Sequence, residues 1–272
     1  MRASKEAAQE AGEMLKQNLD KTGEIFFKGV VDLVTNSDNQ SQKVIFERLS
    51  SSFPEHDFLA EEGLCQKKGA EFRWIIDPLD GTTNYAHQFP IFCISIALEQ
   101  KGEVIMGVVY DPMREEMFWA TKGRGAFLNG KKIKVSSVSD LNKSLVATGF
   151  PYDIRESEVN NIRHFNNFLV RVQAIRRCGS AAMDLCYVAC GRFDGFWELK
   201  LNPWDVAAGA LIVKEARGCL SDFQNEEFSI YGREILATNG LIHEQMVEVL
   251  QLEDREGEKR KKKRQDYEEK QK

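Results

Sequence analysis

The chain has 272 residues, of which 42% are hydrophobic and 29% charged, as expected for a globular protein with one large domain or two closely packed halves. Its longest apolar run, Ile91 to Leu98, is too short to span a bilayer, and residues 1–12 lack the apolar segment of a secretory signal. A formal net charge of −5 argues against general nucleic-acid binding by the body of the protein.

The six cysteines are scattered and form no CxxC pair, which predicts reduced, buried thiols in a cytoplasmic protein. Cys186 and Cys190 would share one face of a helix. We interpret them as packing residues rather than zinc ligands, because none of the four histidines is near them in sequence. The other cysteines are Cys65, Cys93, Cys178 and Cys219.

The N-terminal half, about residues 1–143, is predicted to begin with helices and to continue as a mainly antiparallel sheet. Apolar residues at helical spacing indicate helices over 3–20 and 39–50. Strands are expected at 58–60, 73–76, 91–98, 104–110 and 116–121. A hairpin turn at 100–103 and the Asn129-Gly130 pair separate the later strands.

The C-terminal half, about residues 144–251, alternates between strand and helix patterns, which predicts a layered α/β architecture. The expected strands are 144–148, 174–177, 195–198 and 235–238. The expected helices are 159–171, 180–190, 203–216 and 242–250. Without a flexible linker between the halves, both belong to a single domain, and the functional site is expected where they meet.

The last residues, 252–272, are almost all charged and include a basic run at 259–264. Such a composition cannot bury a core, so we expect a disordered, solvated extension. A basic run of this kind is also typical of a segment that binds RNA.

Two carboxylates, Asp77 and Asp80, follow the apolar residues Trp74 to Ile76, where we expect a buried strand to leave the sheet. Pro78 suits a turn that would aim both carboxylates into one space. Converging carboxylates repel each other unless they are protonated or bridged by cations, and magnesium prefers such oxygen ligands. The segment Gly81-Thr82-Thr83 then offers backbone amides for a phosphate.

Two further acidic groups strengthen this interpretation. Glu61 and Glu62 follow a predicted strand end. Asp205 lies in the first turn of a predicted helix, after an Asn202 N-cap and Pro203. Taken alone, the two glutamates are more typical of a solvated loop, and Asp205 is more typical of helix-dipole compensation.

Together these segments resemble the inositol monophosphatase family, from about residue 5 to residue 250, and the bacterial branch most. The motifs are Glu61-Glu62-Gly63, Trp74 to Asn84, Trp204 to Gly209, Val31 to Thr35 with Asp38, and Gly179 to Ala182. The resemblance implies the five-layer α-β-α-β-α sandwich shared with fructose-1,6-bisphosphatase, hydrolysis of inositol 1-phosphate, lithium sensitivity and a homodimer.

The resemblance also implies a role for individual residues. Two or three Mg²⁺ ions would be held by Glu61, Asp77, the Leu79 carbonyl, Asp80 and Asp205. Thr82 would orient the attacking water, with Asp38 positioning Thr82 and Glu61 assisting. The substrate would contact Gly81, Thr82, Ala181, Glu198 and Lys28.

One departure from the family pattern is Arg217, where a second glycine beside Gly218 is expected. Several substrates stay open, because the ligand set is shared with phosphatases for fructose 1,6-bisphosphate, histidinol phosphate and 3′-nucleotide bisphosphates. A different class of function is binding of RNA or the transcription machinery through the basic tail.

Overall fold

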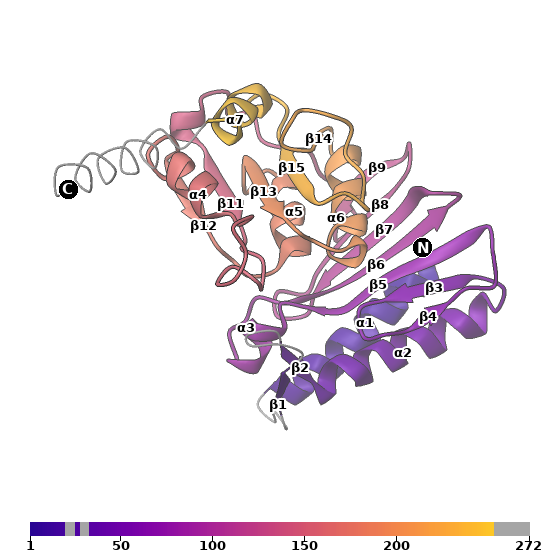
Figure 1. The fold of residues 1–272 in the computed structure, drawn as a ribbon. Coiled ribbons are helices and arrows are strands. Elements are labelled where there is room, and N and C mark those ends of the chain that lie inside the picture. Colours follow the sequence, from indigo (N-terminus) through magenta and orange to yellow (C-terminus); the bar gives the residue numbers. More distant parts are fainter. Residues whose placement is uncertain (20–24, 28–32, 253–272) are drawn as a thin grey trace, which may run out of the picture.

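We describe the protein from a computed structural model, which places residues 1–19, 25–27 and 33–252 (Figure 1). The predicted Lys28 contact, residues 31–32 of the Val31 to Thr35 motif and the charged tail from residue 253 onward lie outside these residues. No helix in the described part of the chain is long and apolar enough to cross a membrane.

The first sheet has eight strands in the order β10-β9-β8-β7-β6-β5-β3-β4. Their bounds are β3 (Asp57–Ala60), β4 (Cys65–Gln66), β5 (Phe72–Asp80), β6 (Cys93–Gln100), β7 (Glu103–Asp111), β8 (Glu116–Thr121), β9 (Gly125–Leu128) and β10 (Lys131–Lys132). Only the β3–β5 pair is parallel. The predicted antiparallel character is therefore correct, and the predicted turn at 100–103 joins β6 to β7.

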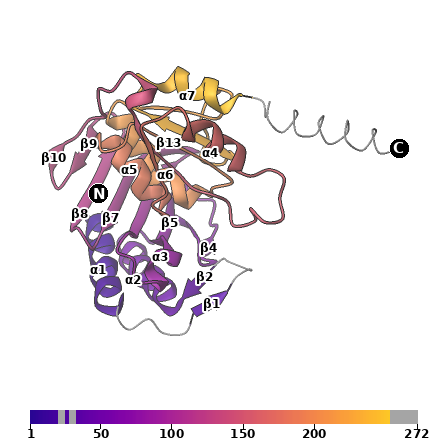
Figure 2. The same ribbon diagram turned by 90° about the vertical axis from the view of Figure 1, so that its left-hand side faces the viewer.

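Two amphipathic helices, α1 (Arg2–Asn18) and α2 (Asn36–Ser52), cover one face of this sheet (Figure 2). Ala7, Ala11 and Leu15 of α1 are buried at helical spacing, together with Ile45 and Leu49 of α2. The antiparallel pair β1 (Ile25–Phe27) and β2 (Leu33–Thr35) lies between the two helices in sequence, and the short α3 (Thr82–Ala86) follows β5.

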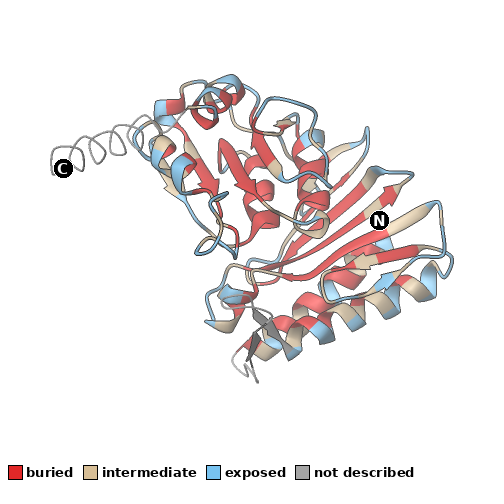
Figure 3. Cartoon of the chain, in the orientation of Figure 1, coloured by how far each residue is buried: buried red, intermediate tan, exposed pale blue. Residues whose placement is uncertain are grey.

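Helices α5 (Ala181–Ala189) and α6 (Pro203–Glu215) form the middle layer, on the opposite face of the first sheet. Every residue of α5 is buried, which explains why its sequence is apolar on all sides apart from Asp184 (Figure 3). The two helices pack closely because Gly209 has no side chain. A Cβ at this position would come within 2.7 Å of the Leu185 side chain.

The second sheet has five strands in the order β12-β11-β13-β15-β14, with parallel pairing on either side of β11. Its strands are β11 (Leu145–Thr148), β12 (Ala174–Arg176), β13 (Gly195–Leu199), β14 (Cys219–Ser221) and β15 (Glu234–Thr238). Helices α4 (Ile162–Leu169) and α7 (His243–Leu250) form the outer layer; a 3₁₀ turn, Leu141–Lys143, precedes β11. The predicted α-β-α-β-α sandwich is thus confirmed.

Several expectations need correction. The strand carrying Asp77 does not leave the sheet there but continues through Pro78 to Asp80. The expected helix 159–171 is shorter, and the short strands β4, β9, β10 and β14 were not predicted, because two to four residues carry too little periodicity. All six cysteines are free, as predicted, but only Cys93 and Cys186 are buried. Cys65 is exposed at the sheet edge, and the other three are partly buried.

Candidate active site

Asp77 and Asp80 line the same pocket because β5 is irregular between them. Side chains three apart on a regular strand point to opposite faces. The pairing of β5 with β6 shifts register between Asp77 and Asp80, as in a β-bulge, and both side chains reach the pocket. Pro78 fits this bulge, since it donates no backbone hydrogen bond.

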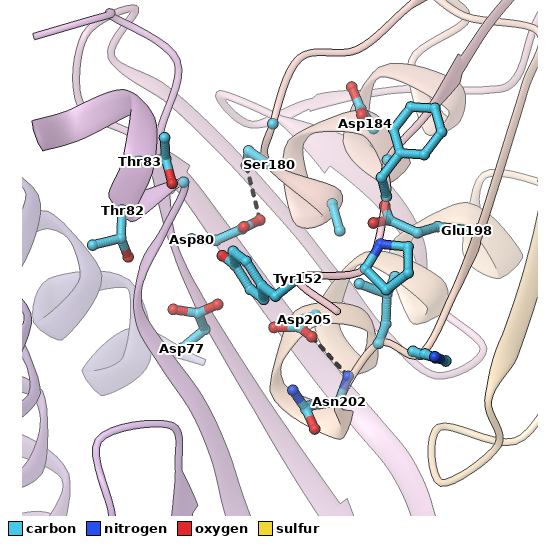
Figure 4. A pocket seen from close by; sticks show the side chains of 18 of the residues that line it. Asp77, Asp80, Thr82, Thr83, Tyr152, Ser180, Asp184, Glu198, Asn202 and Asp205 are labelled. Atoms are coloured by element: carbon cyan, nitrogen blue, oxygen red, sulfur yellow. Dashed lines mark hydrogen bonds between the residues drawn. The ribbon is translucent and has the colours of Figure 1, made fainter. Parts of the chain in front are cut away.

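The Asp80 carboxylate joins the two halves of the protein. Its Oδ2 accepts a hydrogen bond of 2.8 Å from Ser180 Oγ (Figure 4). It also accepts one of 2.7 Å from the Ala182 amide, at the N-terminus of α5. Ser180 is also the N-cap of α5 and accepts from the Met183 amide. The helix N-terminus therefore holds a carboxylate that belongs to the other sheet.

Asp205 and Glu61 reach the pocket from two other elements. Asp205 lies in the first turn of α6, where its Oδ2 accepts a hydrogen bond of 2.7 Å from the Asn202 amide. Glu61 follows the last residue of β3. Asp77 Oδ1 accepts from the Leu79 amide at 3.0 Å. Strand ends and a helix start thus supply four carboxylates to one space.

Thr82 is the first residue of α3 and is almost completely buried. Its hydroxyl oxygen lies 3.0 Å from Asp38 Oδ1 and 3.1 Å from the Leu79 carbonyl oxygen. A hydroxyl has one proton, so only one of these acceptors receives it at a time. Asp38 is fully buried in the first turn of α2, behind Thr82 as seen from the pocket.

Burial and mutual repulsion disfavour the charged forms of these carboxylates. Burial first, then the neighbouring acids, raise the pKa of Asp77 well above its usual range, and the same causes act on Asp205. Burial raises the pKa of Asp80 to about 6, against the effect of its hydrogen bonds from Ser180 and Ala182. A bound cation would remove this cost.

The donor set therefore fits a hard divalent cation: three aspartates, a glutamate and the Leu79 carbonyl are all oxygen ligands. The side chains line the pocket without closing on one point. Across residues 1–19, 25–27 and 33–252, no three His, Cys, Asp or Glu side chains are grouped tightly enough to enclose a metal ion. Repulsion among carboxylates favours such spreading, and a cation between them would draw them together.

The opposite end of the pocket is formed by the C-terminal half. Glu198 on β13 and Asp184 on α5 are buried there (Figure 4), and Ala181 and the exposed Tyr152 line the same pocket. Burial, together with repulsion by Asp184 and Asp80, raises the pKa of Glu198 to about 8. One oxygen of Asp184, Oδ1, is buried without a partner among the described residues.

The structure brings nearly all the sequence-predicted site residues together. One pocket is lined by Glu61, Asp77, Leu79, Asp80, Gly81, Thr82, Ala181, Glu198 and Asp205. Asp38 contacts it through Thr82.

Sequence reasoning missed the hydrogen bond from Ser180 to Asp80 and the position of Asp184 in the pocket. The run Gly179 to Ala182 was the available signal for both, since it marks a helix start made of small residues.

Comparisons with known proteins agree with this fold and site. The model of the inositol monophosphatase family matches residues 1–255. Inositol monophosphatase 1 of Solanum lycopersicum is 45% identical over 254 residues, which is 91% of this chain and 93% of that protein. Nus factor SuhB of Escherichia coli is 44% identical over 220 residues, covering 80% of this chain and 82% of that protein.

Among solved structures, the inositol monophosphatase from Anabaena (Nostoc) sp. superposes with a TM-score of 0.84 at 43% sequence identity. The match covers 92% of this chain and 94% of that one. Fold, site and sequence agree, and the chain belongs to the inositol monophosphatase family of phosphoric monoester hydrolases.

Proposed function

We propose that the protein hydrolyses the phosphate monoester of a small polyol, with inositol 1-phosphate as the substrate that the pocket fits best. The observation that supports this most is the pocket itself. It joins four carboxylates and Thr82 at one end to the acceptor Glu198 at the other. A phosphate and a polyol ring need these two environments side by side.

The family is metal-dependent, and the oxygen ligands favour Mg²⁺. Glu61, Asp77 and the Leu79 carbonyl would hold one ion, and Asp77, Asp80 and Asp205 a second, with a third near Glu61. When bound, such ions lower the pKa of a water molecule and neutralise charge on the leaving oxygen.

Thr82 and Asp38 would orient the attacking water. If the Thr82 hydroxyl donates its proton to Asp38 Oδ1, its lone pairs face the pocket and accept a hydrogen bond from water. The Leu79 carbonyl is then free for its role as a ligand. Glu61 would assist by accepting a proton from the same water, and the amides of Gly81 and Thr82 would bind the phosphate.

Substrate specificity would come from the C-terminal half. Glu198 would accept hydrogen bonds from ring hydroxyls, and Ala181 would lie against the ring. Two buried acids at this end would repel a second phosphate, which disfavours fructose 1,6-bisphosphate and 3′-nucleotide bisphosphates. Arg177 lines the same end and partly offsets this repulsion. Histidinol phosphate carries an amine and needs a direct test.

The decisive experiment is a substrate panel with Mg²⁺ and with a chelator. We expect kcat/KM to be highest for inositol 1-phosphate, lower for glycerol 2-phosphate and lowest for the bisphosphates. Chelation should abolish all turnover. Faster hydrolysis of any bisphosphate or of histidinol phosphate would contradict the substrate assignment, and turnover in the chelator would contradict the metal assignment. Inhibition by Li⁺ is measured in the same assay.

A second candidate function is suggested by the name of the Escherichia coli relative, a Nus factor. We propose that the basic run 259–264 allows contact with RNA or the transcription machinery in addition to catalysis. Salt-dependent RNA binding by the full chain, lost when 252–272 is deleted, would support it.

We also propose a cytoplasmic homodimer, and sedimentation at several concentrations tests the dimer.

A further inference from the structure

The carboxylate of Glu198 is placed by packing rather than by hydrogen bonds. Nothing in the described part of the chain donates a hydrogen bond to it, although Glu198 is only 8% exposed. It lies instead against the backbone of Gly149. A Cβ built on Gly149 would overlap with Cδ and both carboxylate oxygens of Glu198.

Gly149 is therefore needed for space rather than for an unusual backbone conformation. Its φ is outside the left-handed region, so alanine can adopt the same backbone. The atoms that a methyl group would meet are the far end of a flexible side chain. An alanine at 149 would thus move the Glu198 carboxylate while leaving its charge and the surrounding fold in place.

A buried polar network fixes the distance between Gly149 and Glu198. The fully buried Asn161 donates through Nδ2 to the Gly149 carbonyl at 2.6 Å and to Thr148 Oγ1 at 2.7 Å. Its Oδ1 accepts from Trp197 Nε1 at 2.8 Å. Thr148 Oγ1 in turn donates to the Trp197 carbonyl at 2.6 Å.

This network lies at the carboxyl ends of two parallel strands. Thr148 of β11 is in register with Trp197 of β13, so Gly149 and Glu198 are the next pair along. The carboxyl ends of parallel strands are where α/β sheets bind ligands. Asn161 reaches this edge from the start of α4 and locks the two strand ends together.

We propose that Gly149 and Asn161 are positioning residues that hold the Glu198 carboxylate as a fixed acceptor for polyol hydroxyls. This proposal rests on the proposed function and adds how specificity is set. Because no described residue donates a hydrogen bond to Glu198, its carboxyl group keeps this position in the pocket only while Gly149 leaves room there. The substrate class is a phosphate monoester with hydroxyls next to one another.

The test compares kcat/KM for inositol 1-phosphate and for glycerol 2-phosphate in four forms of the full chain: wild type, Gly149→Ala, Glu198→Gln and the double variant. We expect Gly149→Ala to lower the ratio of the two kcat/KM values about tenfold, as the loss of one hydrogen bond would. Glu198→Gln should lower it similarly, and the double variant should lose little more.

Gly195→Ala is a matched control. Gly195 starts the same strand as Glu198, and its added Cβ would also run into the end of a flexible side chain, that of Met246, away from the pocket. We expect it to lower the melting temperature without changing the substrate ratio. A substrate ratio that falls equally in Gly195→Ala would assign the effect to general strain and overturn the proposal.

Other outcomes are equally decisive. If Glu198→Gln lowers the ratio and Gly149→Ala does not, or if their losses multiply, Gly149 does not act through Glu198. If wild type hydrolyses both substrates but Glu198→Gln leaves the ratio unchanged, the positioning proposal alone fails. If wild type hydrolyses neither, the proposed function fails as well. Should Gly149→Ala not fold, Glu198→Asp withdraws the carboxylate from Gly149, and an unchanged ratio would overturn the proposal.

Discussion

At one end of the pocket Asp77, Asp80 and Asp205 each accept a hydrogen bond from a backbone amide, of Leu79, Ala182 and Asn202 respectively. At the other end, Glu198 receives none from the described residues and lies where Gly149 leaves space. Hydrogen bonds to the backbone fix a carboxylate in direction as well as position. The comparison indicates that the end with Asp77, Asp80 and Asp205 is built for ligands of strict geometry. The end with Glu198 is built for substrate hydroxyl groups, which need a less strict geometry.

The largest effect is expected from Asp80→Asn. The amide oxygen can still accept from Ser180 and the Ala182 amide, so the fold is kept while a negative ligand is lost. We expect kcat to fall at least about a hundredfold. In a chelator the melting temperature should rise, because burial raises the pKa of Asp80 to about 6 and its charge is costly above that pH.

Asp184→Asn is the matched control, since it makes the same change in a buried acid at the other end of the pocket. It should also raise the melting temperature, with a much smaller loss of turnover. Near-normal turnover of Asp80→Asn would remove this carboxylate from the metal site.

Substitutions of Thr82 test whether the aspartate end of the pocket acts on the attacking water. Thr82→Ala removes the hydroxyl that contacts Asp38, and we expect kcat to fall about a hundredfold with little change in KM. Thr82→Ser keeps the hydroxyl and should be milder. Equal losses in both variants would show that the threonine methyl group, through packing, matters instead. Steady-state kinetics with inositol 1-phosphate measure both.

The pH dependence of the free energy of unfolding probes the Glu198 end of the pocket. Burial raises the pKa of Glu198 from 4.5 when unfolded to about 8 when folded, so the folded state binds more protons in between. Stability of the wild type should therefore fall, relative to Glu198→Gln, as pH rises from 4.5 to 8. The difference should reach on the order of 5 kcal/mol. Urea unfolding at several pH values in a chelator measures it, and a constant difference would mean that Glu198 is solvated.

The smallest effect is expected from Arg217, which does not line the pocket. This exposed residue has a φ of 71°, a conformation that glycine adopts without strain. Arg217→Gly should stabilise the protein by about 1 kcal/mol and leave the kinetics unchanged. Thermal unfolding and the standard assay check both, and any change in substrate ratio would mean that the pocket responds to distant strain.

Local signals in the sequence were sufficient for much of this protein. Apolar periodicity predicted the main helices and strands, because a helix face or a strand face must be buried. The acidic motifs carried a family resemblance, which implied which residues would meet, and Glu61, Asp77, Asp80 and Asp205 do line one pocket. Motifs of this kind are short-range patterns, which a single sequence can display.

The tertiary structure decided the rest. The bulge that turns Asp77 and Asp80 to one side depends on pairing with β6, and the anchoring of Asp80 by Ser180 joins residues a hundred positions apart. The space left by Gly149 beside Glu198 has no local signature, since a missing Cβ matters only through what lies against it. Such features depend on contacts between distant segments, whose geometry is set only when the sheets and helices pack.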